Sequence, residues 1–160
     1  TLCDEAQIIL KKDSNNIFSN RISEDIFTLA DSWISKEHTL VDLGEDEFTV
    51  GRPHPMIDYT LRNARITQEA TDTETAVILL DVVLGYGSHP DPAEELRSVI
   101  TEACKTVSVI CSITGTEGDP QKRSSVEKVL KNAGAIIMPS NASASLLAGR
   151  IISILEKGAK

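Results

Sequence analysis

Three apolar runs, each followed by a glycine-rich turn, constrain the fold more than any other feature of this sequence. The runs are LVDL from residue 40, AVILLDVVL from residue 76 and VSVICSIT from residue 107. Continuous apolar runs rich in β-branched residues are typical of strands buried on both faces of a parallel sheet. Glycine lets the backbone turn sharply or approach a ligand closely. Because ligands bind outside the carboxyl ends of such strands, the three turns are predicted to face one shared site.

Helical segments alternate with these runs. The expected elements are helix 1–12, strand 39–43, helix 56–70, strand 76–84, helix 92–104, strand 107–113, helix 120–132, strand 135–139 and helix 142–157. Alternating strands and helices with short connections predict a parallel sheet with right-handed crossovers. We therefore expect an α/β fold, a flavodoxin-like three-layer sandwich with a mostly parallel sheet. Residues 13–38 are hard to assign and are expected to form a short helix or a surface excursion.

Composition narrows the function classes. The 160 residues correspond to about one domain. The net charge of −8 disfavours nucleic acid and acidic membrane surfaces as partners, and no apolar run approaches the ~20 residues of a membrane span. We find no signal peptide, and the three cysteines are an odd number without CxxC spacing. Cys104 and Cys111 are therefore expected to be reduced, buried thiols of a cytoplasmic protein.

Three helix starts are candidates for anion binding, because unpaired backbone N–H groups at a helix start can bind phosphate or carboxylate. At two of them, Asp91-Pro92 and Asp119-Pro120, the aspartate is expected to cap the helix and to compete with an anion for those groups. The first helix, which begins with Thr1 and Cys3, is the better candidate. Cys3 near that helix start is expected to have a lowered pKa.

Histidine and arginine in the turns are candidate site residues. His54 stands between two prolines after Gly51 and Arg52, and both a functional role and a packing role stay open for it. His89 follows Gly85-Tyr-Gly87-Ser at a helix entry, where it is either a substrate contact or a local structural or solvent-exposed residue. Arg52 is suited to bidentate binding of phosphate or carboxylate, although an exposed loop arginine is an equal alternative. No spacing supports a metal site.

Several segments resemble one known family. They are TLCDEA from residue 1, GRPHPMID from residue 51 and DVVLGYGSHPDP from residue 81, and the resemblance covers most of residues 1–120. The chain resembles the CoA-ligase domain of the succinyl-CoA synthetase superfamily, specifically the FdrA-like acyl-CoA synthetases. The resemblance implies that residues 1–160 form a CoA-ligase-like domain, part of a longer multidomain protein. The helical start without methionine at Thr1 agrees with that expectation.

The resemblance also implies a site and its ligands. In the superfamily, the helix matching residues 1–12 directs its N-terminus at a phosphorylated group. The turns matching Gly51–Pro55, Gly85–His89 and Gly115–Gly118 line the same region. Full-length relatives carry an upstream CoA-binding domain and use CoA with ATP, ADP or phosphate, none of which this chain is expected to bind tightly alone. An oligomer or a partner subunit is expected as well.

One departure from the family limits the mechanism. Succinyl-CoA synthetases carry a phosphohistidine in a loop whose counterpart here, residues 118–125, contains no histidine. The chain thus resembles the partner half of such an active site, or a branch that handles an acyl or carbamoyl phosphate, as FdrA-like proteins linked to carbamoyl transfer do. A non-catalytic binding or assembly domain remains the other function class, because fold alone does not assign chemistry. Flavin binding and a receiver domain are disfavoured, since few aromatic residues are present and Asp81 lies within an apolar run.

Overall fold

The chain folds into helices and short parallel sheets. The computed structural model describes residues 2–14, 16–21, 23 and 26–158. In chain order the elements are α1 (Leu2–Leu10), β1 (Ile17–Ser19), β2 (Phe27–Thr28), β3 (His38–Leu40), α2 (Asp46–Thr49), α3 (Thr60–Thr71), β4 (Val77–Val83), α4 (Pro92–Ala103), β5 (Ser108–Thr114), α5 (Arg123–Asn132), β6 (Ile136–Met138) and α6 (Asn141–Gly158). From β4 onward, the order of strands and helices agrees with the predicted order.

The strands lie in two parallel sheets of three strands rather than in one. The first has the order β2-β1-β3 and the second the order β4-β5-β6. In the second sheet Val83 pairs with Thr114, and Ser112 pairs with Met138. The first predicted run therefore contributes β3 to a separate sheet, where His38 pairs with Ile17. The α/β class is confirmed, and the single continuous sheet is not.

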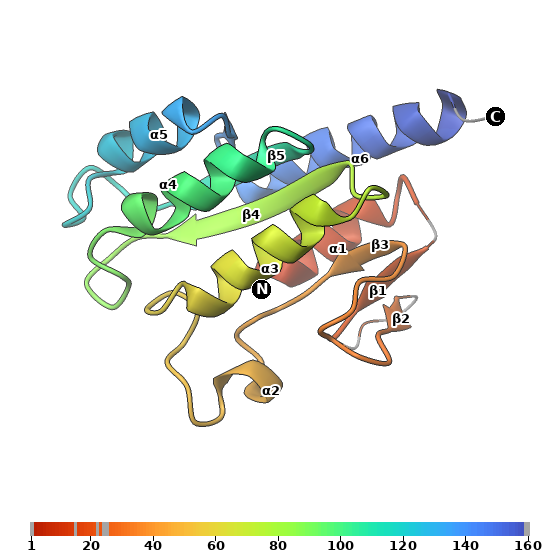
Figure 1. Cartoon of the computed structure of the whole chain (residues 1–160), viewed down its shortest axis with the longest axis horizontal. Helices are drawn as coiled ribbons and strands as arrows, with labels where there is room; N and C mark the ends of the chain where they lie inside the picture. Colours follow the sequence, from red (N-terminus) through yellow and green to blue (C-terminus); the bar gives the residue numbers. More distant parts are fainter. Residues whose placement is uncertain (1, 15, 22, 24–25, 159–160) are drawn as a thin grey trace.

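Helices cover both faces of the β4-β5-β6 sheet, as Figure 1 shows. On one face Ile78 and Val82 of β4 pack in a core with residues of α3, α4 and α5. On the other face Ile110 of β5 packs with Leu10 of α1 and Ala148 of α6. Successive side chains of a strand point to opposite faces, so one apolar run supplies both cores. This arrangement is the three-layer sandwich that the sequence predicts.

Between residues 13 and 38, where a short helix or a surface excursion is expected, the described residues include two short strands. β1 and β2 are three and two residues long and pair in parallel, with Phe18 opposite Phe27. The rings of these two residues stack at a centroid distance of 5.0 Å. Strands this short carry no periodic pattern that a sequence analysis can recognise, because two or three residues span at most one repeat.

The strand β4 lies at the edge of its sheet, and α3 covers part of that edge. Arg62 of α3 donates a hydrogen bond to the backbone carbonyl of Asp81, a residue of β4. The Arg62 side chain is only 13% exposed, and its guanidinium also lies 5.6 Å from the Tyr59 ring centroid. These contacts hold the start of α3 against β4.

Candidate functional site

Two of the glycine turns are joined at the carboxyl edge of the β4-β5-β6 sheet. The Gly85–His89 turn follows β4, and the 115–122 loop follows the parallel neighbour β5. The side chain of Gln121 connects them: its Oε1 accepts from the Gly85 N–H at 3.1 Å, and its Nε2 lies 2.8 Å from the Gly85 carbonyl oxygen. The same Nε2 lies 3.1 Å from Ser88 Oγ and 3.0 Å from the His89 carbonyl oxygen. The two turns therefore form one surface.

The segment 51–58 lies against this surface. The His89 N–H donates to the Met56 carbonyl oxygen at 2.8 Å, and the His89 and Tyr59 rings meet edge to face at 5.8 Å. The third predicted turn is thus brought beside the Gly85–His89 turn, although its strand belongs to the other sheet. The described contacts thus join Met56 and Tyr59 to the Gly85–His89 turn, whereas none of them joins Gly51–Pro55 to the 115–122 loop, so one site shared by all three turns stays a prediction.

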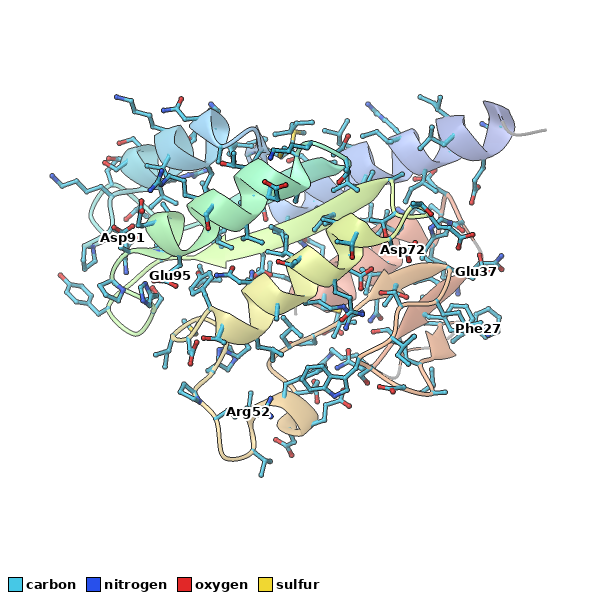
Figure 2. The ribbon with its side chains drawn as sticks, in the orientation of Figure 1. Phe27, Glu37, Arg52, Asp72, Asp91 and Glu95 are labelled. Atoms are coloured by element: carbon cyan, nitrogen blue, oxygen red, sulfur yellow. The ribbon has the colours of Figure 1, made fainter. Side chains whose placement is uncertain are left out.

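Arg52 and His54 are exposed on the loop that follows α2. Among the residues that the structure describes, the Arg52 side chain makes no hydrogen bond or ion pair, and Figure 2 shows it on that loop, away from Asp91 and Glu95 at the start of α4. His54 Nδ1 accepts from the Met56 N–H at 3.2 Å, and a Cβ at Gly44 would lie 2.9 Å from His54 Nε2. The described contacts therefore place this loop against residues 42–44 rather than directly on α1.

The start of α1 lies at the same edge of the sheet. Asn141, the first residue of α6, donates to the Leu2 carbonyl oxygen at 2.9 Å. Asp4 forms an ion pair with Arg21 at 2.8 Å, and Arg21 also pairs with Glu45 in the loop after β3. The Arg21 guanidinium therefore bridges the carboxylates of Asp4 and Glu45. Thr1 lies outside the described residues, so its predicted role in anion binding stays a prediction.

The expectation of an activated Cys3 is wrong. Burial raises the pKa of the Cys3 thiol to about 11, and the nearby Asp42 carboxylate adds to the increase. Its sulfur accepts from Gln7 Nε2 at 3.6 Å. Desolvation of the thiolate outweighs the favourable field of the helix start. Cys111 is fully buried, with its pKa raised by burial to about 12, whereas Cys104 is only half-buried, contrary to expectation. All three cysteines are free.

The two aspartate–proline helix starts differ from each other. At α4 the prediction is confirmed, since Asp91 accepts from the Glu94 N–H at 3.1 Å. At α5 it is wrong: the helix begins at Arg123 rather than Pro120, and Asp119 accepts instead from the Thr116 N–H at 2.5 Å. Glu117 takes the capping role by accepting from the Ser124 N–H at 2.6 Å. A carboxylate therefore occupies both helix starts.

His89 has structural contacts on each side of its ring. Its Nδ1 accepts from the Asp91 N–H at 3.1 Å, and its Nε2 lies 3.9 Å from a Glu95 carboxylate oxygen. With 24% of the side chain exposed, the ring still reaches the surface between α4 and the segment 51–58. The structural role foreseen for His89 is therefore present, and a contact with substrate stays a prediction.

Other regions of the described chain offer weaker sites. The described residues contain no group of histidine, cysteine and acidic side chains that could hold a metal ion. Within the same residues, no helix combines the length and apolar character needed to cross a membrane. A groove of about 950 Å³ lies between α3 and α4, lined by residues such as Asn63, Thr71, Val99 and Thr106. Its lining comes mainly from the second halves of α3 and α4 and the residues that follow them, and it includes none of the predicted site residues.

Three residues with important contacts could not be recognised from the sequence: Gln121, Arg21 and Asn141. Each is a single polar residue without a motif, and its importance depends on a partner distant in the chain. Gln121 contacts Gly85 36 positions away, and Asn141 contacts Leu2 139 positions away. One available signal is that Gln121 falls in the segment that carries a histidine loop in the related synthetases.

Comparison with known proteins gives two findings. The family model described as CoA-ligase matches residues 1–151. The chain is also 36% identical over 159 residues to the uncharacterized protein YahF of Escherichia coli (strain K12). That match covers 95% of this chain and 31% of YahF, so the chain spans less than a third of that relative.

Proposed function

Because this chain belongs to the CoA-ligase family, we propose that it contributes a phosphate- or acyl-phosphate-binding region to the active site of a larger ligase of the FdrA-like acyl-CoA synthetase type. The observation that carries the proposal is the junction of the glycine turns at one sheet edge, where Gln121 bonds to Gly85 and His89 bonds to Met56. Ligands of open α/β sheets bind at this edge.

The proposed roles follow from the chemistry of each group. The exposed guanidinium of Arg52 would bind a phosphate or carboxylate through its planar fork. The backbone of Gly85, Gly87, Gly115 and Gly118 would line the ligand, because glycine leaves room for close approach. His54 and His89 would be the candidate catalytic imidazoles of this region. The start of α1, with Cys3, would contribute through the dipole of the helix.

The transfer of the acyl group to CoA would be carried out by the rest of the larger protein. We propose that CoA and ATP, ADP or phosphate are bound with an upstream CoA-binding domain or a partner subunit, in the cytoplasm. The segment 118–125 has no histidine, so no phosphohistidine relay is assigned to this chain. That same observation favours one alternative, a carbamoyltransferase domain that uses carbamoyl phosphate directly. A binding or assembly domain without catalysis is the other alternative.

A phosphate titration followed by NMR tests the proposal. We expect weak binding, with shifts at the backbone amides of residues 51–56 and 85–89 together with those of residues 115–118. Arg52→Ala should weaken binding severalfold, whereas Lys122→Ala should change it little, because Glu117 already occupies the start of α5. Shifts confined to residues 115–123 would mean that the site lies on another helix. Absence of any saturable shift up to high millimolar phosphate would contradict the proposal.

The chain alone should not phosphorylate itself. Incubation with labelled ATP or acyl phosphate should leave His54 and His89 unlabelled, since neither lies in the loop that carries phosphohistidine in the related synthetases. Acid-labile label on either residue would overturn this assignment and would favour a catalytic histidine within the domain.

A further inference from the structure

Every hydrogen-bonding group of the Gln121 side-chain amide has a partner in the neighbouring Gly85–His89 turn. Its Oε1 accepts one backbone hydrogen bond, from Gly85. Its two N–H bonds face three oxygens at 2.8 to 3.1 Å: the carbonyl oxygens of Gly85 and His89 and the Ser88 hydroxyl. A primary amide has two donors and one acceptor oxygen, so this side chain binds both the N–H and the C=O of the same residue, Gly85.

We propose that Gln121 is the positioning residue of the phosphate-binding region, holding the Gly85–His89 turn in one conformation against the 115–122 loop. This inference rests on the proposed function for its ligand, but the clamp itself is a property of the two loops. A turn fixed before binding pays no ordering cost when a ligand arrives.

The turn offers backbone groups that such a clamp would fix. Among the described residues, the backbone N–H groups of Tyr86 and Gly87 have no hydrogen-bond partner, and both residues are exposed. Tyr86 is 91% exposed although its turn is held on both sides by Gln121 and by the His89–Met56 bond. An exposed turn with this many anchors is ordered by its contacts rather than by burial.

No other side chain of similar length could replace this amide. A glutamate would present only acceptors to the carbonyl oxygens of Gly85 and His89, and a lysine would offer no acceptor to the Gly85 N–H. A methionine matches the length of glutamine and makes none of these bonds. The next residue, Lys122, has a φ of +55°, a left-handed conformation uncommon outside glycine, which places the Gln121 backbone at a sharp change of direction.

The replacement Gln121→Glu gives a test whose result depends on protonation. When the new carboxyl group is ionised it repels the two carbonyl oxygens; when protonated it can donate to one and still accept from Gly85 N–H. The charged neighbours in sequence are Asp119, whose carboxylate would favour the protonated form of the new group, and Lys122, whose ammonium would favour the ionised form. Hydrogen-exchange protection of the Gly85 and Ser88 amides should therefore fall at least tenfold at pH 7.5 and recover at about pH 4.

A matched control is Gln68→Glu, the same change at an exposed helix position where the amide donates only to the Trp33 carbonyl oxygen at 3.0 Å. It should leave protection of residues 85–89 unchanged at both pH values. Unchanged protection in Gln121→Glu at pH 7.5 would overturn the proposal. Lost protection without recovery at low pH would overturn it too, because general loosening of the loop does not depend on one proton.

The neutral replacement Gln121→Met separates positioning from the proposed function. Its phosphate affinity should fall about tenfold relative to the unmodified chain, with the far-UV circular dichroism unchanged. Equal affinity would overturn the positioning role. If neither protein binds phosphate, the proposed function fails, and the exchange experiment still decides whether Gln121 clamps the turn.

Discussion

Asn141 and Glu5 are 136 positions apart in the sequence, yet Asn141 Nδ2 lies 2.7 Å from Glu5 Oε2. The same amide donates to the Leu2 carbonyl oxygen, so the first turn of α6 holds the first turn of α1. Further along, a Cβ at Gly149 would lie 2.6 Å from Asp13 Oδ2. The two helices therefore run side by side in the same direction along one face of the sheet (Figure 1).

Asn141→Ala should destabilise the chain, because Asn141 is buried and its two acceptors on α1 would lose their donor. We expect a loss of about 1–3 kcal/mol in the free energy of unfolding, measured by urea denaturation. Asn132→Ala is the control, since Asn132 is exposed at the end of α5. Equal losses in the two variants would mean that the Asn141 contacts do not stabilise the docking of α1.

Gly115→Ala should be destabilising, because a Cβ there would lie 2.6 Å from Leu84 Cβ. Overpacking of this kind costs about 1–3 kcal/mol. Gly118→Ala is the matched control in the same loop, where the nearest atom to a new Cβ is Thr116 Oγ1 at 3.5 Å. Thermal unfolding should show a clear decrease in Tm for the first variant and little change for the second. A reversed order would show that the contact with Leu84 relaxes freely.

Ser145→Ala should increase stability. The Ser145 side chain is fully buried in α6, and its Oγ has no hydrogen-bond partner in the described structure. Removing a desolvated, unpaired hydroxyl should raise the free energy of unfolding by about 1 kcal/mol. Ser153→Ala, in the same helix but half-buried, reports the gain from helix propensity alone. A decrease in stability for Ser145→Ala would indicate that the hydroxyl has a bound water as its partner.

The stability of the chain should fall above pH 9. Burial raises the pKa of Cys3 to about 11 and that of Cys111 to about 12 in the folded state, against 9.0 for a cysteine thiol exposed to water. Between these values the unfolded chain releases thiol protons that the folded chain keeps, so unfolding becomes more favourable as pH rises. Urea midpoints at pH 8 and pH 10.5 measure the effect. The double variant Cys3→Ala with Cys111→Ala should show a shallower decrease, and an equal slope would exclude the thiols as its cause.

The same burial predicts an order of cysteine modification. At pH 8 iodoacetamide should label Cys104 first. Cys3 is half-buried as well, but its surroundings raise the pKa of its thiol to about 11, and Cys111 is fully buried with a pKa of about 12, so both should react slowly. Mass spectrometry of the intact and digested protein identifies the labelled residue. Unfolded protein should react at all three positions. Rapid labelling of Cys3 in the folded chain would restore the earlier expectation of an activated thiol.

The long apolar runs made much of the fold predictable. β4 and β5 are seven-residue strands whose ranges agree with prediction within two residues, and α4 begins at the predicted Asp91-Pro92 cap. These features depend on local chemistry, namely buried β-branched residues, proline at the first helical position and a capping carboxylate. Such features can be predicted because residues that are adjacent in the sequence determine them.

The parts that escaped prediction depend on contacts between distant residues. β1 and β2 form because β1 pairs with both β2 and β3, not because their residues form a pattern. The helix α5 begins three residues later than predicted, because Asp119 accepts a hydrogen bond within its own turn and Glu117 caps the helix instead. The position of Cys3 near a helix start predicted a lowered pKa. In the structure, burial of the thiol raises the pKa instead, and this burial depends on packing that the sequence does not reveal. At the candidate site, the sequence located the turns but not the amide that joins them.

The position of Arg62 against β4 has a consequence for the behaviour of the protein in concentrated solution. A seven-residue apolar strand with a free edge is a template on which another chain can add a strand and begin to aggregate. Here a largely buried cation occupies the Asp81 carbonyl near the end of that edge, and an incoming strand would have to displace it. The contact that fixes α3 thus also protects the most apolar strand of the sheet from self-association.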